Sequence, residues 1–392
     1  MERRCGTKIM KNVDLSVEFL GFKLRNPLIA APGPFTRDYY SIAKLVDAGI
    51  GAVITKTILP KPSVNPRPCL YRGHGFFLNT ERCSTLPLSQ WLEKELPKAA
   101  TLSIPIIASI GMTPEEVVQI AKPVVAAGAH MLELAIFTPY DDPTPMVKAV
   151  QLTKKEVDVP IIVKLSCNVH DLVEFGEAVK EAGADALSAI DALKAGISVD
   201  SQTGRPVLLE QGFGRISGEA IKPLALYHVA QLAYYVGLPI IGTGGVFSAQ
   251  DVIDMFYCGA SAVGICTALI LYGPDIIKGI LQQMCEKLYK LGVSSLQDIR
   301  GKTLEWIDFP HDVEERREYE KRVWEEKQLV ANINLELCIA CGRCEKMCLY
   351  QAITPFKNKF NVLKEKCQGC GLCVSLCPTN AIKFIKLESD IS

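Results

Sequence analysis

Residues 338–348 read Cys-Ile-Ala-Cys-Gly-Arg-Cys-Glu-Lys-Met-Cys, and residues 367–378 read Cys-Gln-Gly-Cys-Gly-Leu-Cys-Val-Ser-Leu-Cys-Pro. Both stretches have the spacing Cys-x2-Cys-x2-Cys-x3-Cys. They also match beyond the cysteines, since residues 351–353 (Gln-Ala-Ile) correspond to residues 380–382 (Asn-Ala-Ile). The segment is therefore an internal repeat of about 30 residues that supplies four thiols per half.

This spacing is typical of bacterial ferredoxins with two [4Fe–4S] clusters, in which the fourth cysteine of each run binds the other cluster. Three thiolates on one tight loop reach three irons, and a fourth arrives from a separate segment. Structural zinc is the alternative, because Cys-x2-Cys pairs also bind zinc. We predict one cluster at Cys338, Cys341, Cys344 and Cys377, and a second at Cys367, Cys370, Cys373 and Cys348.

The preceding 300 residues carry eight short apolar runs separated by amphipathic stretches. The runs do not alternate, as expected for parallel strands buried on both faces. The expected strands are 27–31, 51–56, 105–109, 131–137, 160–165, 186–191, 239–242 and 262–266, and the expected helices include 113–127, 171–182 and 248–259. The last helix begins with Ser248 and Asp251 at the spacing of a capping box. Eight such units predict an α/β fold, a (β/α)8 TIM barrel, with an open doubly wound sheet as the alternative.

The composition changes abruptly after the barrel. Residues 312–327 contain twelve charged residues in sixteen, which favours a solvated linker helix. We therefore divide the chain into a barrel (1–303), a charged helical linker (304–330) and an α+β ferredoxin domain (331–392).

The overall charge and the N-terminus restrict the class of protein. Lys plus Arg and Asp plus Glu both total 43, without the basic excess typical of nucleic-acid binders. No apolar segment follows the N-terminus as in a secretory signal, and none is long enough for a membrane helix. We expect a cytoplasmic protein that binds neither nucleic acid nor membrane.

Two lysines end expected strands, at the edge of a barrel where chemistry takes place. Lys56 ends the second strand and Lys164 lies in the fifth. A buried lysine needs an anionic or hydrogen-bonding partner, so each belongs either to a ligand site or to a structural salt bridge. Glycines at 244–245 and the turn at 264–267 fit the phosphate site of such barrels. Together these features suggest a phosphorylated cofactor.

The chain resembles the dihydroorotate dehydrogenase and dihydropyrimidine dehydrogenase family over most of its length. The resemblance rests on seven segments: 26–31, 53–57, 65–68, 77–81, 162–165, 216–218 and 242–245. The arrangement is similar to the barrel-plus-ferredoxin subunit of bacterial NAD-dependent dihydropyrimidine dehydrogenases.

The resemblance implies that the barrel binds FMN. Lys164 would face the N1/O2 edge of the flavin, where a cation stabilises the anionic reduced form. The residues implied along the flavin are Ala31, Lys56, Thr57 and Asn79, and those implied around the ribityl phosphate are Ser217, Gly218, Gly244, Gly245, Cys266 and Thr267.

The substrate side departs from the family pattern. The family's pyrimidine-binding asparagine after strand four falls at Ala135, and its acid/base cysteine or serine falls at Thr138. The Asn-Thr pair after strand six falls at residues 191–192, Asp-Ala. A pocket built to hydrogen-bond a pyrimidine loses orders of magnitude when those groups are missing. We therefore predict a substrate other than uracil, thymine or orotate.

Candidate residues for the reaction remain on this side. Thr138 and Tyr140 are the candidate proton donors, and Asn79, Glu81 and Asp191 are candidate substrate-binding residues. A threonine hydroxyl is a poor acid without a relay.

The predicted activity is reduction, or the reverse formation, of a carbonyl-activated C=C bond of a small molecule. Electrons would pass through the two clusters to FMN from a separate protein, either an NAD(P)H-dependent FAD subunit or a ferredoxin. The family resemblance also suggests a homodimer. The alternatives are a dihydropyrimidine dehydrogenase subunit acting on uracil or thymine, a dihydrouridine synthase acting on RNA, and an electron-transfer protein without small-molecule catalysis.

Overall fold

The computed structural model describes residues 13–138, 142–208, 212–309, 313–326 and 329–386. The chain divides into two compact units, residues 1–307 and 308–392. Within these described ranges, no helix combines the length and hydropathy that a membrane-spanning helix requires.

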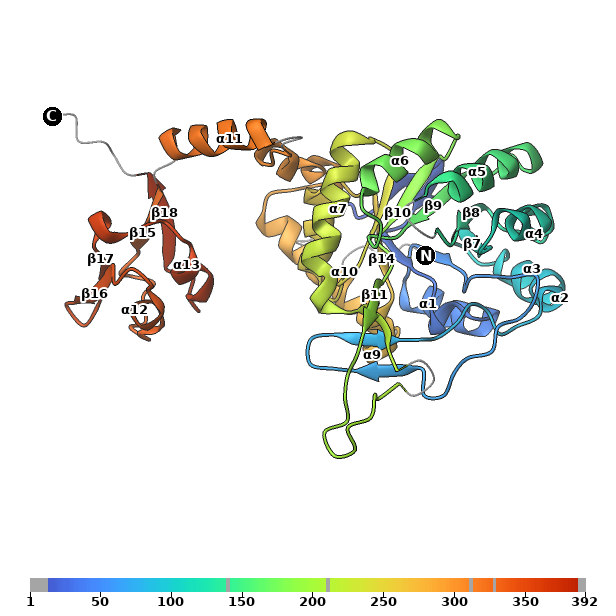
Figure 1. Cartoon of the computed structure of the whole chain (residues 1–392), viewed down its shortest axis with the longest axis horizontal. Helices are drawn as coiled ribbons and strands as arrows, with labels where there is room; N and C mark the ends of the chain where they lie inside the picture. The colour runs from blue at the N-terminus through green and yellow to red at the C-terminus, as the bar shows by residue number, and fades with distance from the viewer. Residues whose placement is uncertain (1–12, 139–141, 209–211, 310–312, 327–328, 387–392) are drawn as a thin grey trace. The chain divides into compact units, whose positions relative to one another are not determined.

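Eight parallel strands in the first unit close into a barrel (Figure 1). The order around the barrel is β10-β13-β14-β3-β4-β7-β8-β9. The strands are β3 (Leu28–Ala30), β4 (Ala52–Ile54), β7 (Ile106–Ile110), β8 (Met131–Leu134), β9 (Ile161–Leu165), β10 (Ala186–Ala189), β13 (Ile240–Thr243) and β14 (Ala262–Ile265). Each lies within or beside a run predicted from the sequence. The closed barrel is confirmed, and the open doubly wound sheet is wrong.

Helices follow the strands and surround the barrel. The main helices are α1 (Tyr39–Ala48), α4 (Pro114–Ala126), α5 (Thr144–Glu156), α6 (Leu172–Glu181), α7 (Lys222–Tyr235), α8 (Ala249–Tyr257) and α10 (Ile276–Lys290). Shorter ones are α2 (Leu88–Gln90), a π-helical turn (Trp91–Glu95), α3 (Leu96–Ala99) and α9 (Thr267–Tyr272). The capping box predicted for α8 is present: Ser248 Oγ accepts from the amide of Asp251, and Asp251 Oδ2 accepts from the amide of Ser248 at 2.7 Å. Two unpaired amides at the start of α8 are satisfied in this way.

A second, antiparallel sheet lies against the carboxyl ends of the barrel strands. Its order is β11-β12-β6-β5, and its strands are β5 (Leu70–Arg72), β6 (Phe77–Asn79), β11 (Leu193–Gly196) and β12 (Gly214–Ser217). Side-chain contacts described below join it to residues that follow β4, β10 and β14. A further hairpin joins β1 (Val17–Phe19) to β2 (Phe22–Leu24). The sequence did not predict this second sheet.

The second unit begins with the charged helix α11 (Val313–Glu326). The cysteine-rich part contains β15 (Leu329–Ile333), α12 (Arg343–Met347), β16 (Ile353–Phe356), β17 (Lys359–Val362), α13 (Leu372–Leu376) and β18 (Ile382–Lys386). The order strand–helix–strand occurs twice, as β15-α12-β16 and β17-α13-β18, and each antiparallel pair, β15–β18 and β16–β17, joins a strand of one half of the sequence repeat to a strand of the other. The C-terminal α+β ferredoxin fold is confirmed.

Candidate active site and cluster-binding residues

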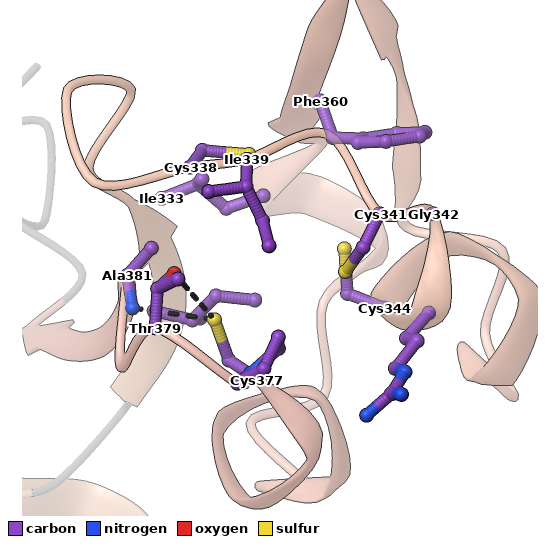
Figure 2. A pocket seen from close by; sticks show the side chains of 13 residues that line it. Ile333, Cys338, Ile339, Cys341, Gly342, Cys344, Phe360, Cys377, Thr379 and Ala381 are labelled. Atoms are coloured by element: carbon purple, nitrogen blue, oxygen red, sulfur yellow. Dashed lines mark hydrogen bonds between the residues drawn. The ribbon is translucent and has the colours of Figure 1, made fainter.

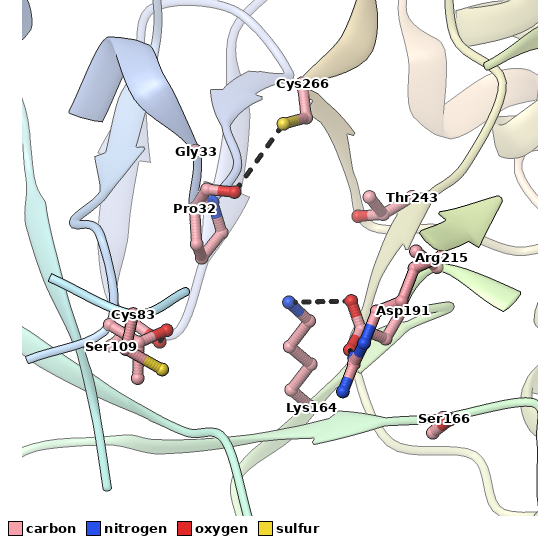
Figure 3. A network of polar contacts seen from close by, with 12 residues as sticks. Pro32, Gly33, Cys83, Ser109, Lys164, Ser166, Asp191, Arg215, Thr243 and Cys266 are labelled. Atoms are coloured by element: carbon pink, nitrogen blue, oxygen red, sulfur yellow. Dashed lines mark hydrogen bonds and ion pairs between the residues drawn. The ribbon is translucent and has the colours of Figure 1, made fainter. Parts of the chain in front are cut away.

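The two strand-end lysines of the barrel each pair with a carboxylate. Lys56, just beyond β4, donates from Nζ to Glu81 Oε2 at 2.6 Å. Lys164, on β9, lies with its Nζ 3.0 Å from Asp191 Oδ1 (Figure 3). The carboxylates reach the lysines from other elements, Glu81 from the loop after β6 and Asp191 from the segment after β10. The partners that buried lysines require are therefore supplied within the chain.

Asp191 is shared between two cations. Its second oxygen, Oδ2, accepts from Arg215 Nη1 at 2.9 Å, and Arg215 lies on β12. Burial would raise the pKa of Asp191, but the charges of Lys164 and Arg215 outweigh it and hold that pKa below its ordinary value. For Lys164, burial would lower the pKa, and Asp191 with Glu133 reverses this and holds it above the ordinary value. Both groups are therefore charged at neutral pH.

Glu133 is a site residue that the sequence interpretation missed. It lies on β8, directly opposite Ser109 of β7 and Ile162 of β9, and it is fully buried. Neither carboxyl oxygen has a hydrogen-bond partner among the described residues. Burial raises the pKa of Glu133, opposed by the charge of Lys164 and the nearby hydroxyls of Ser109 and Ser188. A charged residue inside an otherwise apolar strand was the available signal.

The residues implied around a ribityl phosphate gather at neighbouring strand ends. Ser217, at the end of β12, and Thr267, after β14, share a hydrogen bond between their hydroxyls at 2.9 Å. Gly218, Gly244 and Gly245 all have positive φ, a region that residues with a Cβ rarely adopt. Hydroxyls beside a turn of this kind are suitable ligands for an anion.

The residues implied along the flavin also lie at this end of the barrel. Ala31 follows β3, and its amide donates to the carbonyl of Ile265 at 3.0 Å. Thr57 Oγ1 lies 3.1 Å from Ser109 Oγ. Asn79 Oδ1 accepts from the amide of Glu81 at 2.6 Å, which fixes the loop that carries Glu81.

Cys266 and Gly33 approach each other closely beside this group. Cys266 Sγ lies 3.5 Å from the carbonyl oxygen of Pro32, and a Cβ added to Gly33 would lie 2.8 Å from that sulfur. A larger residue at position 33 would therefore displace Cys266. Burial raises the pKa of Cys266 to about 11, so its thiol is neutral.

These residues fit FMN. Two paired lysines, a set of hydroxyls and glycine turns line the end of the barrel where such enzymes bind their cofactors. FMN, when bound there, would be held by Lys56, Lys164 and the hydroxyls of Ser217 and Thr267.

The structure supports the predicted substrate-side residues less fully than the predicted cofactor-binding residues. Ala135 follows β8 and offers no polar side chain at that strand end. Thr138 is half-buried, and its hydroxyl makes no hydrogen bond to any described residue. Tyr140 lies outside the described residues.

The eight repeat cysteines gather in two pockets. Cys338, Cys341, Cys344 and Cys377 line the first (Figure 2), and Cys348, Cys367, Cys370 and Cys373 line the second. The fourth cysteine of each run thus lies with the first three of the other. Apolar side chains complete the walls, including Ile333 and Phe360 in the first pocket and Tyr350 and Phe384 in the second.

Backbone amides point at several of these sulfurs. Cys348 Sγ accepts from the amide of Ala352 at 3.3 Å, and Cys377 Sγ accepts from that of Ala381 at 3.2 Å. Cys367 Sγ accepts from the amide of Ala331 at 3.4 Å. Such bonds stabilise thiolates and tune the clusters that they hold. Four thiols around each pocket, with amides aimed at the sulfurs, fit [4Fe–4S] clusters.

Comparison with known proteins identifies the family. Residues 14–288 match the dihydroorotate dehydrogenase family, and residues 331–384 match the family described as 4Fe-4S dicluster domain. The chain belongs to the dihydroorotate dehydrogenase family. It is an oxidoreductase that acts on CH–CH groups, in a family that binds FMN, and it carries an iron–sulfur domain.

Several dihydroorotate dehydrogenases are similar to this chain, each named the catalytic subunit of dihydroorotate dehydrogenase B (NAD(+)). The protein of Geobacillus sp. (strain WCH70) is 37% identical over 306 residues, which cover 74% of this chain and 95% of the relative. That of Anoxybacillus flavithermus is 38% identical over 304 residues, covering 74% and 96%. That of Geotalea uraniireducens is 36% identical over 313 residues, covering 74% and 99%.

Proposed function

We propose that this member of the dihydroorotate dehydrogenase family reduces, or in reverse forms, a carbonyl-activated C=C bond of a small molecule other than a pyrimidine. Electrons enter through two [4Fe–4S] clusters and reach FMN in the barrel. The Lys164–Asp191 pair carries the proposal, because it places a fixed positive charge at the carboxyl end of β9. FMN, when bound, supplies hydride transfer to and from carbon.

The chain's own residues then have defined roles. Lys164 provides a positive charge where negative charge develops during reduction, and Asp191 holds its ammonium in place. The hydroxyls of Ser217 and Thr267 bind the phosphate end of the cofactor. Thr138 or Tyr140 delivers the proton to the α-carbon of the substrate.

The substrate class follows from what the pocket lacks. At position 135 an alanine offers no hydrogen bond, and at position 191 both carboxylate oxygens already accept from cations. A pyrimidine ring presents several N–H and C=O groups that would lose their partners in such a site, at a cost of about 1–3 kcal/mol for each group left unpaired. Enones, enoates and enoyl thioesters need fewer such partners.

The electron donor is a second protein. Each of the two pockets is lined by four cysteines that would hold a one-electron carrier, and the similar proteins are themselves named catalytic subunits. An NAD(P)H-dependent FAD subunit or a free ferredoxin would supply the electrons. We also propose that the chain acts in the cytoplasm and forms a homodimer.

A second candidate is dehydrogenation of dihydroorotate, or reduction of uracil or thymine. The names of the relatives, at 36–38% identity, favour dihydroorotate.

An acceptor screen separates these candidates. The full chain is purified without oxygen, reduced with dithionite and freed of excess reductant, and its flavin and cluster spectra are followed after each addition. We expect reoxidation by an activated alkene and none by orotate, uracil or thymine. Rapid reoxidation by a pyrimidine would contradict the substrate class. A chain that holds flavin and iron but transfers electrons to no acceptor except another redox protein would be an electron carrier.

A further inference from the structure

The Asp191 carboxylate joins residues from three separate elements. Its Oδ1 lies 3.0 Å from Lys164 Nζ on β9, and its Oδ2 lies 2.9 Å from Arg215 Nη1 on β12 (Figure 3). Asp191 itself follows β10. Each carboxylate oxygen is therefore held by a different cation, and the carboxylate cannot turn without breaking one of the two ion pairs.

Arg215 is held by the sheet that carries it. In the pairing of β12 with β6, Arg215 lies opposite Asn79 and Ser217 lies opposite Phe77. The Ser217 hydroxyl bonds that of Thr267, beyond β14. The backbone that carries Arg215 is thus fixed both to β6 and to the barrel. The position from which the Arg215 side chain extends is therefore fixed as well.

The other ion pair, between Lys56 and Glu81, has no second cation of this kind among the described residues. Lys56 and Glu81 pair at 2.6 Å with side chains that are 10% and 12% exposed. Lys164 is more exposed, at 20%, and Asp191 is 27% exposed. A more solvated pair holds its geometry less well, because water competes for both partners. Arg215 adds a second ion pair to the more exposed carboxylate, Asp191.

The surroundings of Lys164 below the pair are also charged. Glu133 lies opposite Ile162, which shares the inward face of β9 with Lys164, so Glu133 lies one layer deeper in the barrel. Asp191 and Glu133, from different elements, therefore both raise the pKa of Lys164. Among the described residues, Asp191 is the one of these two carboxylates that also pairs with a second cation, Arg215.

We propose that Arg215 is a positioning residue that fixes the Lys164 ammonium through Asp191 and does not bind the substrate. The inference rests on the proposed FMN site and goes beyond it, because neither the family resemblance nor the lysine pattern assigns a role to position 215. Arg215 would set how strongly the site favours the reduced over the oxidised cofactor.

The test is the midpoint potential of the bound flavin, measured on the full chain without substrate. Arg215→Gln should lower the preference for reduced over oxidised flavin about tenfold, a modest coupling between sites. For a two-electron couple, this fold-change is about 30 mV. Arg215→Lys should restore at least half of the shift, because a lysine can still pair with Asp191.

A double-mutant cycle separates action through Asp191 from a direct effect of charge. In the Asp191→Asn background, Arg215→Gln should change the potential by less than about a third of its effect in the wild type. Lys154→Gln is the matched control, since it removes the 2.6 Å Lys154–Asp185 pair before β10, at the other end of the barrel. It should leave the potential unchanged.

Three results would overturn the proposal. A raised KM with an unchanged potential would make Arg215 a substrate ligand, and a lowered Tm with an unchanged potential would make it purely structural. Equal shifts in both backgrounds would show a direct effect of charge. Because the potential is measured without substrate, the shift itself does not depend on which alkene is reduced. Absence of bound flavin in the wild type would instead contradict the proposed function.

Discussion

The barrel and the cysteine-rich part obtain their stability in different ways. In the barrel, the residues of β3, β4 and β14 are fully buried, and both site lysines, Lys56 and Lys164, are paired with carboxylates of the chain. In the cysteine-rich part, the buried core includes a cluster of Ala331, Ile333, Cys344, Ile353, Val362 and Ile382, with further cysteines packed against it. The barrel builds its site from packing and ion pairs. The smaller region has cysteines within and against its core.

Removing iron should affect only one of the two regions, and it should have the largest effect. A core of this size is too small to stabilise a fold alone, and metal binding supplies the missing free energy. After iron is removed from the full chain by oxidation and chelation, trypsin should cleave at Arg343, Lys357 and Lys364. The barrel should resist. Mass spectrometry of the fragments shows which of the two regions trypsin cleaves. A cysteine-rich part that stays protected without iron would contradict the proposed difference in how the two regions are stabilised.

Lys164→Met should abolish most activity and leave the barrel folded. The substitution removes a preorganised charge, which typically costs about 10²–10³ in kcat. Asp191 keeps its partner Arg215, so this carboxylate is not left unpaired. Lys154→Met is the control of similar chemistry at the opposite end of the barrel. Activity assays measure kcat and thermal unfolding measures Tm for both variants. Equal losses of activity in the two variants would refute a specific role for Lys164.

Glu133→Gln should make stability less dependent on pH. Burial raises the pKa of Glu133 in the folded state. The stability linked to this group is fully present below the unfolded pKa of about 4.3 and is lost as pH rises through the folded pKa. Glutamine does not titrate, so the free energy of unfolding of the variant should rise relative to that of the wild type as the pH increases above the unfolded pKa. Urea unfolding from pH 4 to 8 measures the difference in the free energy of unfolding between variant and wild type. A difference that decreases as pH rises would contradict the raised pKa of Glu133.

Ser248→Ala should have the smallest effect, because it removes only the cap of α8. Loss of an N-cap typically costs about 1 kcal/mol. Asp251 keeps its bond to the amide of Phe247 at 2.9 Å and its ion pair with Lys222. Urea unfolding would give this value, while Ser248→Asp should retain most of the stability. A loss several times larger would show that Ser248 supports more than the helix end.

Local sequence patterns predicted the barrel strands and the two sets of cysteines, but they did not predict pairings between distant segments. Each apolar run and each cysteine motif can be recognised from a few consecutive residues. The sheet formed by β5, β6, β11 and β12 is not, because its strands have only three or four residues and the pairing of β6 with β12 joins segments more than a hundred residues apart.

The same limit applies to the candidate site. Lys56 and Lys164 stood out as charges at strand ends, and each was expected to need a partner. That Asp191 pairs with both Lys164 and Arg215 depends on where β12 crosses the barrel, which no local pattern reports. Glu133 was readable as a charge within a strand and was overlooked.

The central claim is that the two regions act in series, with electrons collected at the clusters and delivered at the barrel. Counting electrons in the full chain tests this most directly. A dithionite titration should show four electrons taken up, two at the flavin and one at each cluster. An accepted alkene should then reoxidise all three centres and yield two equivalents of product per chain. Clusters that stay reduced after the flavin is reoxidised, with one equivalent of product, would contradict the account.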